Sequence, residues 1–96
     1  MTASRSRGHF VYIVRCGDGT LYTGYARDPH ARALAHNSGH GAKYTSGRRP
    51  VTLIHLEPFR SKGRALRREH QIKKWPRAKK EALCRDSLKG VASRHV

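Results

Sequence analysis

The stretch FVYIVRCGDGTLYTG, at residues 10–24, constrains the fold of this chain more than any other feature. Its first residues are β-branched and aromatic, CGDGT supplies turn residues, and LYTG resumes the strand pattern, which together predict a β-hairpin. With GDG as a three-residue loop, Cys16 pairs with Thr20. Tyr12 and Tyr22 then point to the same face of the sheet, whereas a slip of one residue would put them on opposite faces.

The segment after this hairpin predicts a short helix followed by a long loop. Residues 28–39, DPHARALAHNSG, begin with Asp28 as a suitable N-cap and Pro29 at the first helical position. Residues 39–50, GHGAKYTSGRRP, are expected to form a loop, and loops of this length in a compact domain are often functional. The inward-facing apolar residues of the helix would be Ala31, Leu34 and Ala35.

The remaining sequence predicts one more strand and two more helices. VTLIHLE, at residues 51–57, reads as a strand closed by Pro58. A helix then starts from a Ser61 cap and stops before Pro76, and a last helix covers residues 77–88. Together these elements predict an α+β fold with a three-stranded antiparallel sheet flanked by helices, in the order strand, strand, helix, strand, helix, helix.

The length of the chain, 96 residues, allows one compact core. We expect residues 9–87 to form the domain, 1–8 a mobile N-terminal arm and 88–96 a mobile basic tail. Cys16 and Cys84 lie far apart without metal-ligand spacing, so both thiols are expected to stay reduced. The chain has no apolar run of about 18 residues and no signal-peptide pattern at its start, which favours a cytoplasmic protein.

The charge balance indicates a polyanionic partner. Twenty-one Lys and Arg residues against six Asp and Glu give a net charge of +15. This is the electrostatic footprint of a nucleic-acid binder, because each phosphate contact releases counterions. On composition alone, a generic polyanion binder such as a structural RNA-binding protein of the ribosomal kind fits as well. The residues expected to contact the nucleic acid are Arg27, Lys43, Tyr44, Arg48, Arg49, Lys73 and Lys74.

The helix that follows Ser61 carries an acidic residue within its apolar stripe. Ala65, Leu66 and Ile72 form the stripe, and Glu69 completes its spacing of three and four residues. Burying a carboxylate costs free energy unless the group is paired or bound to a metal. Glu69 is therefore expected either in a buried salt bridge with an arginine or as a single ligand for a hard cation that faces a groove.

Arg32 and His36 form a second candidate pair. They are four residues apart, so they are neighbours on one flank of the predicted helix. An arginine beside a histidine suits a site that binds a phosphate and moves a proton. Together with Tyr12, Tyr22 and Glu69, the pair makes a candidate catalytic constellation.

The spacing of these residues closely resembles a known family. VYI around Tyr12 and YTG from Tyr22, with the tyrosines ten residues apart, resemble the paired signature of the GIY-YIG endonuclease superfamily. Arg32 stands ten residues after the second tyrosine, as the helix-borne arginine of the family does, and His36 follows one turn later. Glu69 matches the metal-binding glutamate of the family. The stretch HNSGHGAKYTSGRRPVTLI is similar to the connecting loop and third strand of the short, standalone bacterial members.

The resemblance covers about residues 9–84, with some departures. The first triplet begins with Val11 and keeps only the central tyrosine of the signature in place. Tyr25 stands where some members carry a lysine. Many members use an asparagine in the last helix to steady the site, and here Lys80 or Glu81 stands near that place.

The resemblance implies metal-dependent hydrolysis of a phosphodiester bond in DNA. Glu69 would hold Mg²⁺ or Mn²⁺, and Arg32 would neutralise the charge that builds on the phosphorus. A tyrosine would take a proton from the attacking water, and positive charge from Arg32, the metal and His36 would lower its pKa from the ordinary value of about 10. Tyr12 is favoured as this base, with Tyr22 positioning the water or the phosphate, although the reverse assignment stays open.

The resemblance also bears on the substrate. A domain of this size without a targeting module has little surface for reading base sequence, so we expect a substrate defined by its form: single-stranded first, then flapped or branched DNA. Tyr12 and Tyr22 are expected to line the mouth of a cleft with their hydroxyls facing the substrate. Tyr44 would either stack on a base or pack on the sheet, and Trp75 is expected to pack at a helix junction. The alternative function is a non-catalytic nucleic-acid-binding module of the same fold.

Overall fold

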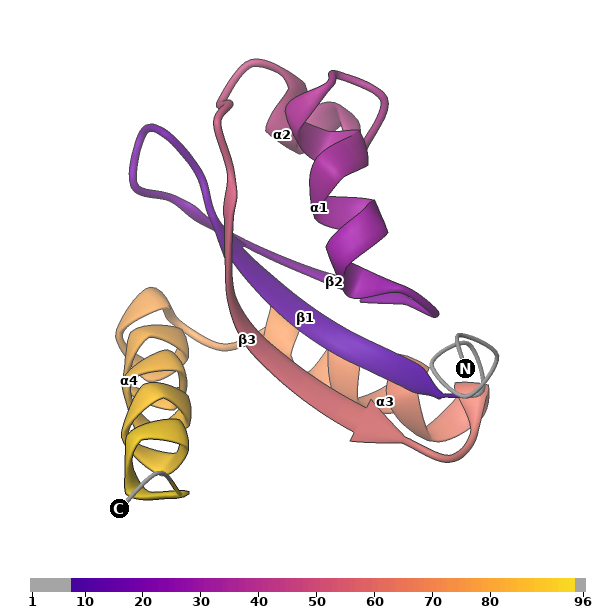
Figure 1. Ribbon diagram of the computed structural model, residues 1–96, viewed down its shortest axis with the longest axis vertical. Coiled ribbons are helices and arrows are strands. Elements are labelled where there is room, and N and C mark those ends of the chain that lie inside the picture. Colours follow the sequence, from indigo (N-terminus) through magenta and orange to yellow (C-terminus); the bar gives the residue numbers. More distant parts are fainter. Residues whose placement is uncertain (1–7, 95–96) are drawn as a thin grey trace.

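A computed structural model of the chain describes residues 8–94, with side chains described through Asp86. The strands are β1 (His9–Arg15), β2 (Leu21–Ala26) and β3 (Thr52–Phe59), and the helices are α1 (Pro29–Asn37), α2 (Lys43–Ser46), α3 (Lys62–Lys73) and α4 (Arg77–Arg94). The strands form one antiparallel sheet in the spatial order β2-β1-β3 (Figure 1). The predicted α+β class and order of elements are confirmed. Residues 1–7 and 95–96, which belong to the predicted arm and tail, lie outside the described residues.

The predicted hairpin register is confirmed. The Cys16 N–H donates to the Thr20 carbonyl at 2.8 Å, which closes the GDG loop. Tyr12 pairs with Gly24 across the strands, and its ring lies on the same face as the ring of Tyr22, with 6.4 Å between centroids. Gly24 is required at this place, because a Cβ there would collide with the hydroxyl of Tyr12.

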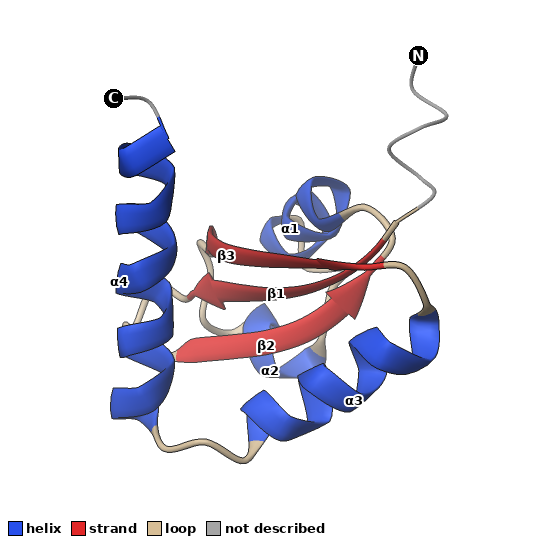
Figure 2. Cartoon of the chain, turned by 90° about the horizontal axis from the view of Figure 1, so that it is seen from below, coloured by secondary structure: helices blue, strands red, loops and turns tan. Residues whose placement is uncertain are grey.

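Helices cover both faces of the sheet (Figure 2). α1 lies on one face with α2 packed against it, α3 crosses the other face, and α4 stands at the end of the sheet where β1 ends (Figures 1 and 2). Because successive residues of β1 point to opposite sides, the faces hold separate apolar clusters. On the α3 side the buried residues are Val11, Ile13, Leu21, Ala65, Ile72 and Cys84. On the α1 side they are Tyr12, Val14, Cys16, Ala26 and Val51.

The capping residues start the helices as predicted. The Asp28 side chain accepts a hydrogen bond from the Ala31 N–H at the start of α1. The Ser61 hydroxyl accepts one from the Arg64 N–H, at 3.2 Å, at the start of α3. Each cap satisfies a backbone donor that would otherwise lack a partner in the first turn.

The prediction that α1 packs inward through Ala31, Leu34 and Ala35 is wrong. Leu34 is 71% exposed and Ala31 is exposed, whereas His36 is completely buried. The helix is rotated because His36 finds hydrogen-bond partners on β1 and α2, and a buried polar group is stable only when it has such partners.

Three element boundaries also differ from the prediction. β3 continues through Pro58 to Phe59 instead of ending at the proline, because β3 is an edge strand and needs no hydrogen bond from that position. The segment 39–50 is not only a loop, since it contains α2. α4 runs on past Leu88 to Arg94.

Two further findings concern the cysteines and the character of the helices. Cys16 and Cys84 are both free and buried. Among the described residues, no helix has the length and apolar character needed to cross a membrane.

Candidate active site

The candidate residues meet at the edge of the sheet formed by β2, with α1 on one side and α3 on the other. Three aromatic rings form the centre. The His36 ring centroid lies 5.9 Å from that of Tyr12 and 5.4 Å from that of Tyr22. β1, β2 and α1 thus bring together three side chains that the sequence spacing singled out.

Tyr12 lies deeper than expected. It is 1% exposed, and its Oη atom lies 2.9 Å from Nε2 of His36. Burial raises the pKa of Tyr12 to about 12, with the nearby Arg32 guanidinium acting in the opposite direction. The expectation that Tyr12 lines the mouth of a cleft is therefore wrong, because its side chain is buried and its hydroxyl is hydrogen-bonded to the imidazole. Tyr22 is only partly buried.

His36 is held on its other side by Thr45, a completely buried residue of α2. The His36 Nδ1 and Thr45 Oγ1 atoms are 2.7 Å apart, and the Thr45 hydroxyl donates to the Ala42 carbonyl at 2.9 Å. Two tautomers fit these contacts. With the proton on Nδ1, His36 donates to Thr45 and its Nε2 accepts from Tyr12. With the proton on Nε2, His36 donates to Tyr12 and its Nδ1 accepts from the Ala42 N–H, at 3.3 Å. Burial, with the positive charge of Arg32, lowers the pKa of His36, so the imidazole is neutral at neutral pH.

Gly41 makes room for the imidazole. A Cβ at Gly41 would collide with Nδ1 and the ring of His36. Sequence reasoning missed both Gly41 and Thr45. Neither residue lies in a recognisable sequence pattern. The one hint in the sequence was that Thr45 has a hydroxyl that can form hydrogen bonds.

Glu69 lies on α3, and its charge is close enough to Tyr12 to act on the pKa of that tyrosine. The glutamate side chain is 18% exposed, and Oε2 lies 3.3 Å from Nζ of Lys73. Lys73 in turn lies 5.6 Å from the centroid of the Tyr22 ring. Among the side chains described, Lys73 is the one salt-bridge partner of Glu69, so the carboxylate pairs with a neighbouring lysine rather than with an arginine.

The surroundings of Glu69 fit a cation held by one carboxylate. No group of three His, Cys, Asp or Glu side chains is placed to hold a metal among the described residues. Mg²⁺ is commonly bound by one or two carboxylates together with water and substrate phosphates. A half-buried carboxylate whose neighbour is a flexible, 46% exposed lysine meets that requirement.

Arg32 is exposed on α1 and lines a hollow at the end of β2. The hollow has a volume of about 430 Å³ and includes Tyr25, Arg27 and Asp28. The Arg27 guanidinium, predicted to contact nucleic acid, donates from Nε to the Gly8 carbonyl at 2.6 Å. Arg27 and Arg32 thus stand at the same end of β2.

Two predicted nucleic-acid contacts, Arg48 and Arg49, hold the α2 segment in place. Arg48 bonds to Asp18 at 3.1 Å and to the Tyr44 carbonyl at 2.8 Å. Arg49 donates to the carbonyls of Ser46 and Asn37, at 2.9 and 3.3 Å. These guanidinium groups therefore already have structural partners.

The Tyr44 ring packs on the sheet through Tyr22 of β2, which is one of the two expectations for it. The ring stacks on that of Tyr22 with 5.6 Å between centroids, and the Arg48 guanidinium lies 4.2 Å from its centre. Tyr44 nevertheless remains 41% exposed, and Lys43 beside it is exposed.

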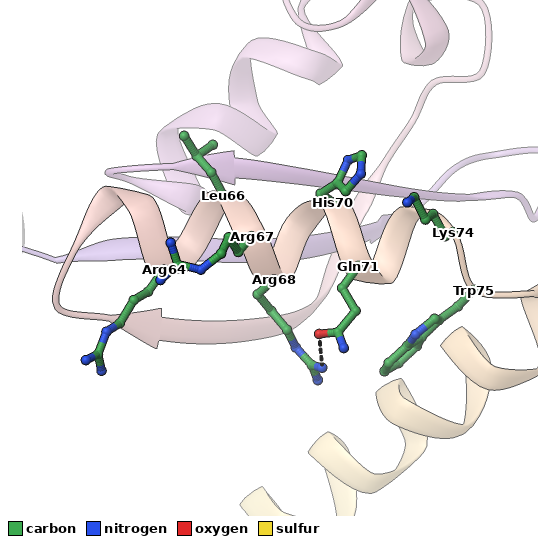
Figure 3. A pocket seen from close by; sticks show the side chains of 8 residues that line it. All are labelled: Arg64, Leu66, Arg67, Arg68, His70, Gln71, Lys74 and Trp75. Carbon is green, nitrogen blue, oxygen red and sulfur yellow. Dashed lines mark hydrogen bonds between the residues drawn. The ribbon is translucent and has the colours of Figure 1, made fainter.

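Lys74 lies on the outer face of α3, apart from the cluster of rings. It lines an open hollow together with Arg64, Arg67 and Trp75 (Figure 3). Trp75 packs against the core at the junction of α3 and α4, as predicted. Its ring is flanked by two cations, Arg68 at 5.0 Å and Lys79 at 4.2 Å.

The sequence model described as "GIY-YIG catalytic domain" matches residues 8–82, most of the chain. The fold is therefore that of a small nuclease-type catalytic domain, and the chain belongs to the GIY-YIG family. The UPF0213 protein VNG_2274C of Halobacterium salinarum is 59% identical over 75 residues, which are 78% of this chain and 97% of that protein. The UPF0213 protein SAV0488 of Staphylococcus aureus is 55% identical over 78 residues, 81% of this chain and 95% of that protein.

Two solved structures share the fold. The solution NMR structure of the UPF0213 protein BH0048 from Bacillus halodurans has a TM-score of 0.52 and 49% identity, covering 79% of this chain and 81% of that one. The solution NMR structure of the protein EF2693 from E. faecalis has a TM-score of 0.55 and 44% identity, covering 78% and 80%.

Proposed function

We propose that the protein is a metal-dependent endonuclease that hydrolyses phosphodiester bonds in DNA, with single-stranded DNA preferred and branched or flapped DNA next. The observation that carries this proposal is the hydrogen-bonded chain from Tyr12 through His36 to Thr45. Tyr22 lies beside Tyr12. The charges of Arg32 and Glu69 both act on the pKa of Tyr12. This arrangement has a proton path and an anion site next to each other, which hydrolysis of a phosphate ester needs.

The proton path explains how a tyrosine of high pKa acts as a base. With a pKa of about 12, Tyr12 is protonated at neutral pH. In the tautomer with the proton on Nδ1 it does not have to ionise first. Once substrate binding brings water to the buried hydroxyl, Tyr12 passes its own proton to Nε2 of His36 while it takes one from that water. The bond from Nδ1 to Thr45 then orients the imidazolium that forms. Tyr22, partly exposed beside this pair, positions the water or the phosphate.

The charges of the site are divided between its two sides. Arg32, on α1, neutralises charge on the equatorial oxygens of the phosphate, which is positioned electrostatic stabilisation. Glu69, on α3, would hold Mg²⁺ or Mn²⁺, and such an ion supplies charge neutralisation at a non-bridging oxygen and at the leaving oxygen when bound. Lys73 pairs with Glu69 at 3.3 Å, and it would be free to contact the substrate if a cation took its place on the carboxylate.

The shape of the β2 edge favours an open strand as substrate. One hollow lies at the end of β2, lined by Arg27 and Arg32, and a smaller one lies at its start. The six residues of β2 span about 20 Å, which is enough for a few nucleotides of extended single-stranded DNA. Cations near both ends and aromatic rings between them are the usual parts of single-strand sites.

Cleavage of end-labelled DNA tests the proposal. Single-stranded, duplex and flapped substrates are incubated with Mg²⁺, Mn²⁺ or EDTA. We expect cuts that need the cation, that are fastest on single strands, and that fall by roughly 100-fold or more in Glu69→Gln. Asp86→Asn, which removes an exposed carboxylate of α4, is the matched control and should cleave like the parent.

A non-catalytic DNA-binding module is the second candidate, favoured by the burial of the Tyr12 hydroxyl. The same experiment separates the two functions. Tight binding of all three DNA forms without a cut under any metal condition would replace the nuclease by this module. Stronger binding to RNA than to DNA at matched salt would point instead to an RNA-binding protein.

A further inference from the structure

A small hollow opens at the start of β2, next to the candidate active site. Its volume is about 170 Å³. It adjoins the site through Tyr44, whose ring stacks on that of Tyr22. The residues that line it are Thr20, Leu21, Tyr44, Arg77 and Lys80.

Lys80 is the unusual group in this hollow. It is half-buried, and burial together with the positive charge of Lys73 lowers its pKa. Among the side chains described, no carboxylate forms a salt bridge with it. Glu81, its neighbour in the sequence, bonds to Arg15 at 2.8 Å and to Arg77 at 3.3 Å instead.

The ammonium groups of Lys73 and Lys80 thus lie near each other, and no described carboxylate pairs with Lys80. A half-buried cation beside a like charge is unfavourable unless an anion compensates it. The acids on this side of the molecule already have partners, Glu69 with Lys73 and Glu81 with two arginines. An anion that enters the hollow would meet Lys80 without having to displace a carboxylate from it.

We propose that this hollow is a phosphate subsite, in which Lys80 binds the backbone phosphate next to the cleaved bond of a single strand lying along β2. The identity of the strand rests on the function proposed above. Arg77 shapes the wall rather than binding the phosphate, because its guanidinium is held by the Gly19 carbonyl at 2.8 Å and by Glu81. Among the described side chains that line the hollow, Lys80 is the cation for whose side chain no hydrogen bond or salt bridge is formed, whereas Arg77 is held by two partners.

The salt dependence of binding tests the subsite. A fluorescent single-stranded oligonucleotide is titrated in EDTA at several salt concentrations. Lys80→Met removes the charge but keeps an unbranched side chain of similar length. Lys80→Arg keeps the charge. Lys79→Met is the matched control, because the Lys79 ammonium lies over the Trp75 ring and does not line the hollow.

In Lys80→Met the slope of log affinity against log salt concentration should fall in magnitude by about 0.7, the value for one lost phosphate contact on a single strand. Lys80→Arg and Lys79→Met should keep the slope of the parent. Equal slopes in Lys80→Met and Lys79→Met would overturn the subsite.

A second measurement uses the unaltered protein and does not depend on the folding of a variant. Lysines are acylated and the rate at each position is followed by peptide mass spectrometry. A saturating oligonucleotide should slow the modification of Lys80 several-fold and leave Lys79 unchanged. Unchanged labelling of Lys80 would overturn the subsite, and so would equal protection by inorganic phosphate at the same concentration, since the ligand would then be a free anion.

Neither readout requires cleavage, so this proposal and the proposed function can fail separately. Binding that depends on Lys80 in a protein that never cuts would keep the subsite and remove the nuclease. Cleavage with the same salt slope in every variant would keep the nuclease and remove the subsite.

Discussion

Tyr12, His36 and Thr45 come from three different elements, yet each side chain is held by the next through a buried hydrogen bond. Gly24 and Gly41 make this possible, because a Cβ at either position would collide with the tyrosine or with the histidine. The chemistry at the scale of single residues therefore depends on two small residues as well as on three polar ones.

Thr45 is expected to position His36 through its hydroxyl. Thr45→Val removes the hydroxyl that is hydrogen-bonded to Nδ1 of His36. A buried polar atom that loses its partner costs about 1–3 kcal/mol. We expect a loss of that size in the free energy of unfolding by urea, and a slower cleavage rate under native conditions. Thr45→Ser, which keeps the hydroxyl, is the control. Equal cleavage rates for the valine and serine variants would contradict this role.

The proposed proton path also predicts a pH dependence. The pKa of His36 lies below its ordinary value of 6.5, so His36 stays neutral through neutral pH and gains a proton only at a lower pH. A protonated His36 cannot accept the proton of Tyr12, so the cleavage rate should fall as the pH decreases through the His36 pKa. NMR titration of the His36 ring, beside a pH–rate profile, checks this. A His36 pKa at or above 6.5 would contradict the prediction.

At the scale of elements, the site depends on how α1, α2 and β2 pack together. α1 turns His36 inward and leaves Leu34 exposed, which the apolar pattern of its sequence does not predict. α2 brings Thr45 to the histidine, and Arg48 and Arg49 fix this segment through bonds to Asp18 and to backbone carbonyls. The two arginines predicted to contact DNA thus also hold α2 in its place beside the site.

The close approach of β1 and β2 gives a prediction at this scale. Gly24→Ala places a methyl group where the Tyr12 hydroxyl lies, and such overpacking typically costs about 1–3 kcal/mol. We expect a lower free energy of unfolding and a displaced Tyr12 ring. Gly47→Ala is the control, since a Cβ there meets nothing within 4 Å and its backbone conformation suits alanine. Similar stabilities for the two variants would show that Tyr12 has room to move.

At the scale of the whole molecule, one ion-pair cluster ties α3 to the sheet and so places Glu69. Glu57 of β3 bonds to Arg68 of α3 at 2.8 Å and to His55 at 2.9 Å. Burial by itself raises the pKa of Glu57, but the hydrogen bonds from His55 and Arg68 and their charges outweigh it and lower the pKa to about 2.

This lowered pKa makes Glu57 a contributor to stability above pH 4.5, its ordinary pKa, and the contribution is lost as the pH falls toward 2. Glu57→Gln should reduce the free energy of unfolding by about 1–3 kcal/mol at pH 7, and this difference from the parent should shrink between pH 4.5 and 2. Urea unfolding across this pH range measures it, with Asp86→Asn as the control. A difference that does not change with pH would rule out the carboxylate as the cause.

Much of the fold is predictable from local sequence. The CGDGT turn fixes the hairpin register, and Asp28 and Ser61 start their helices, because turns and caps depend on residues that are near one another in the chain. The spacing of Tyr12, Tyr22, Arg32, His36 and Glu69 likewise predicts that these residues gather at one site.

What the sequence by itself determined is thus the three strands, the helices α1, α3 and α4, their order and the candidate catalytic residues, but not α2. Tertiary structure alone decided the burial of Tyr12 and the rotation of α1. It also decided the partnership of His36 with Thr45 and the placement of Lys80 in a hollow beside Tyr44. The physical reason is that a hydrogen bond or a charge environment depends on atoms brought together from distant segments, and no local pattern records which distant residue will supply the partner.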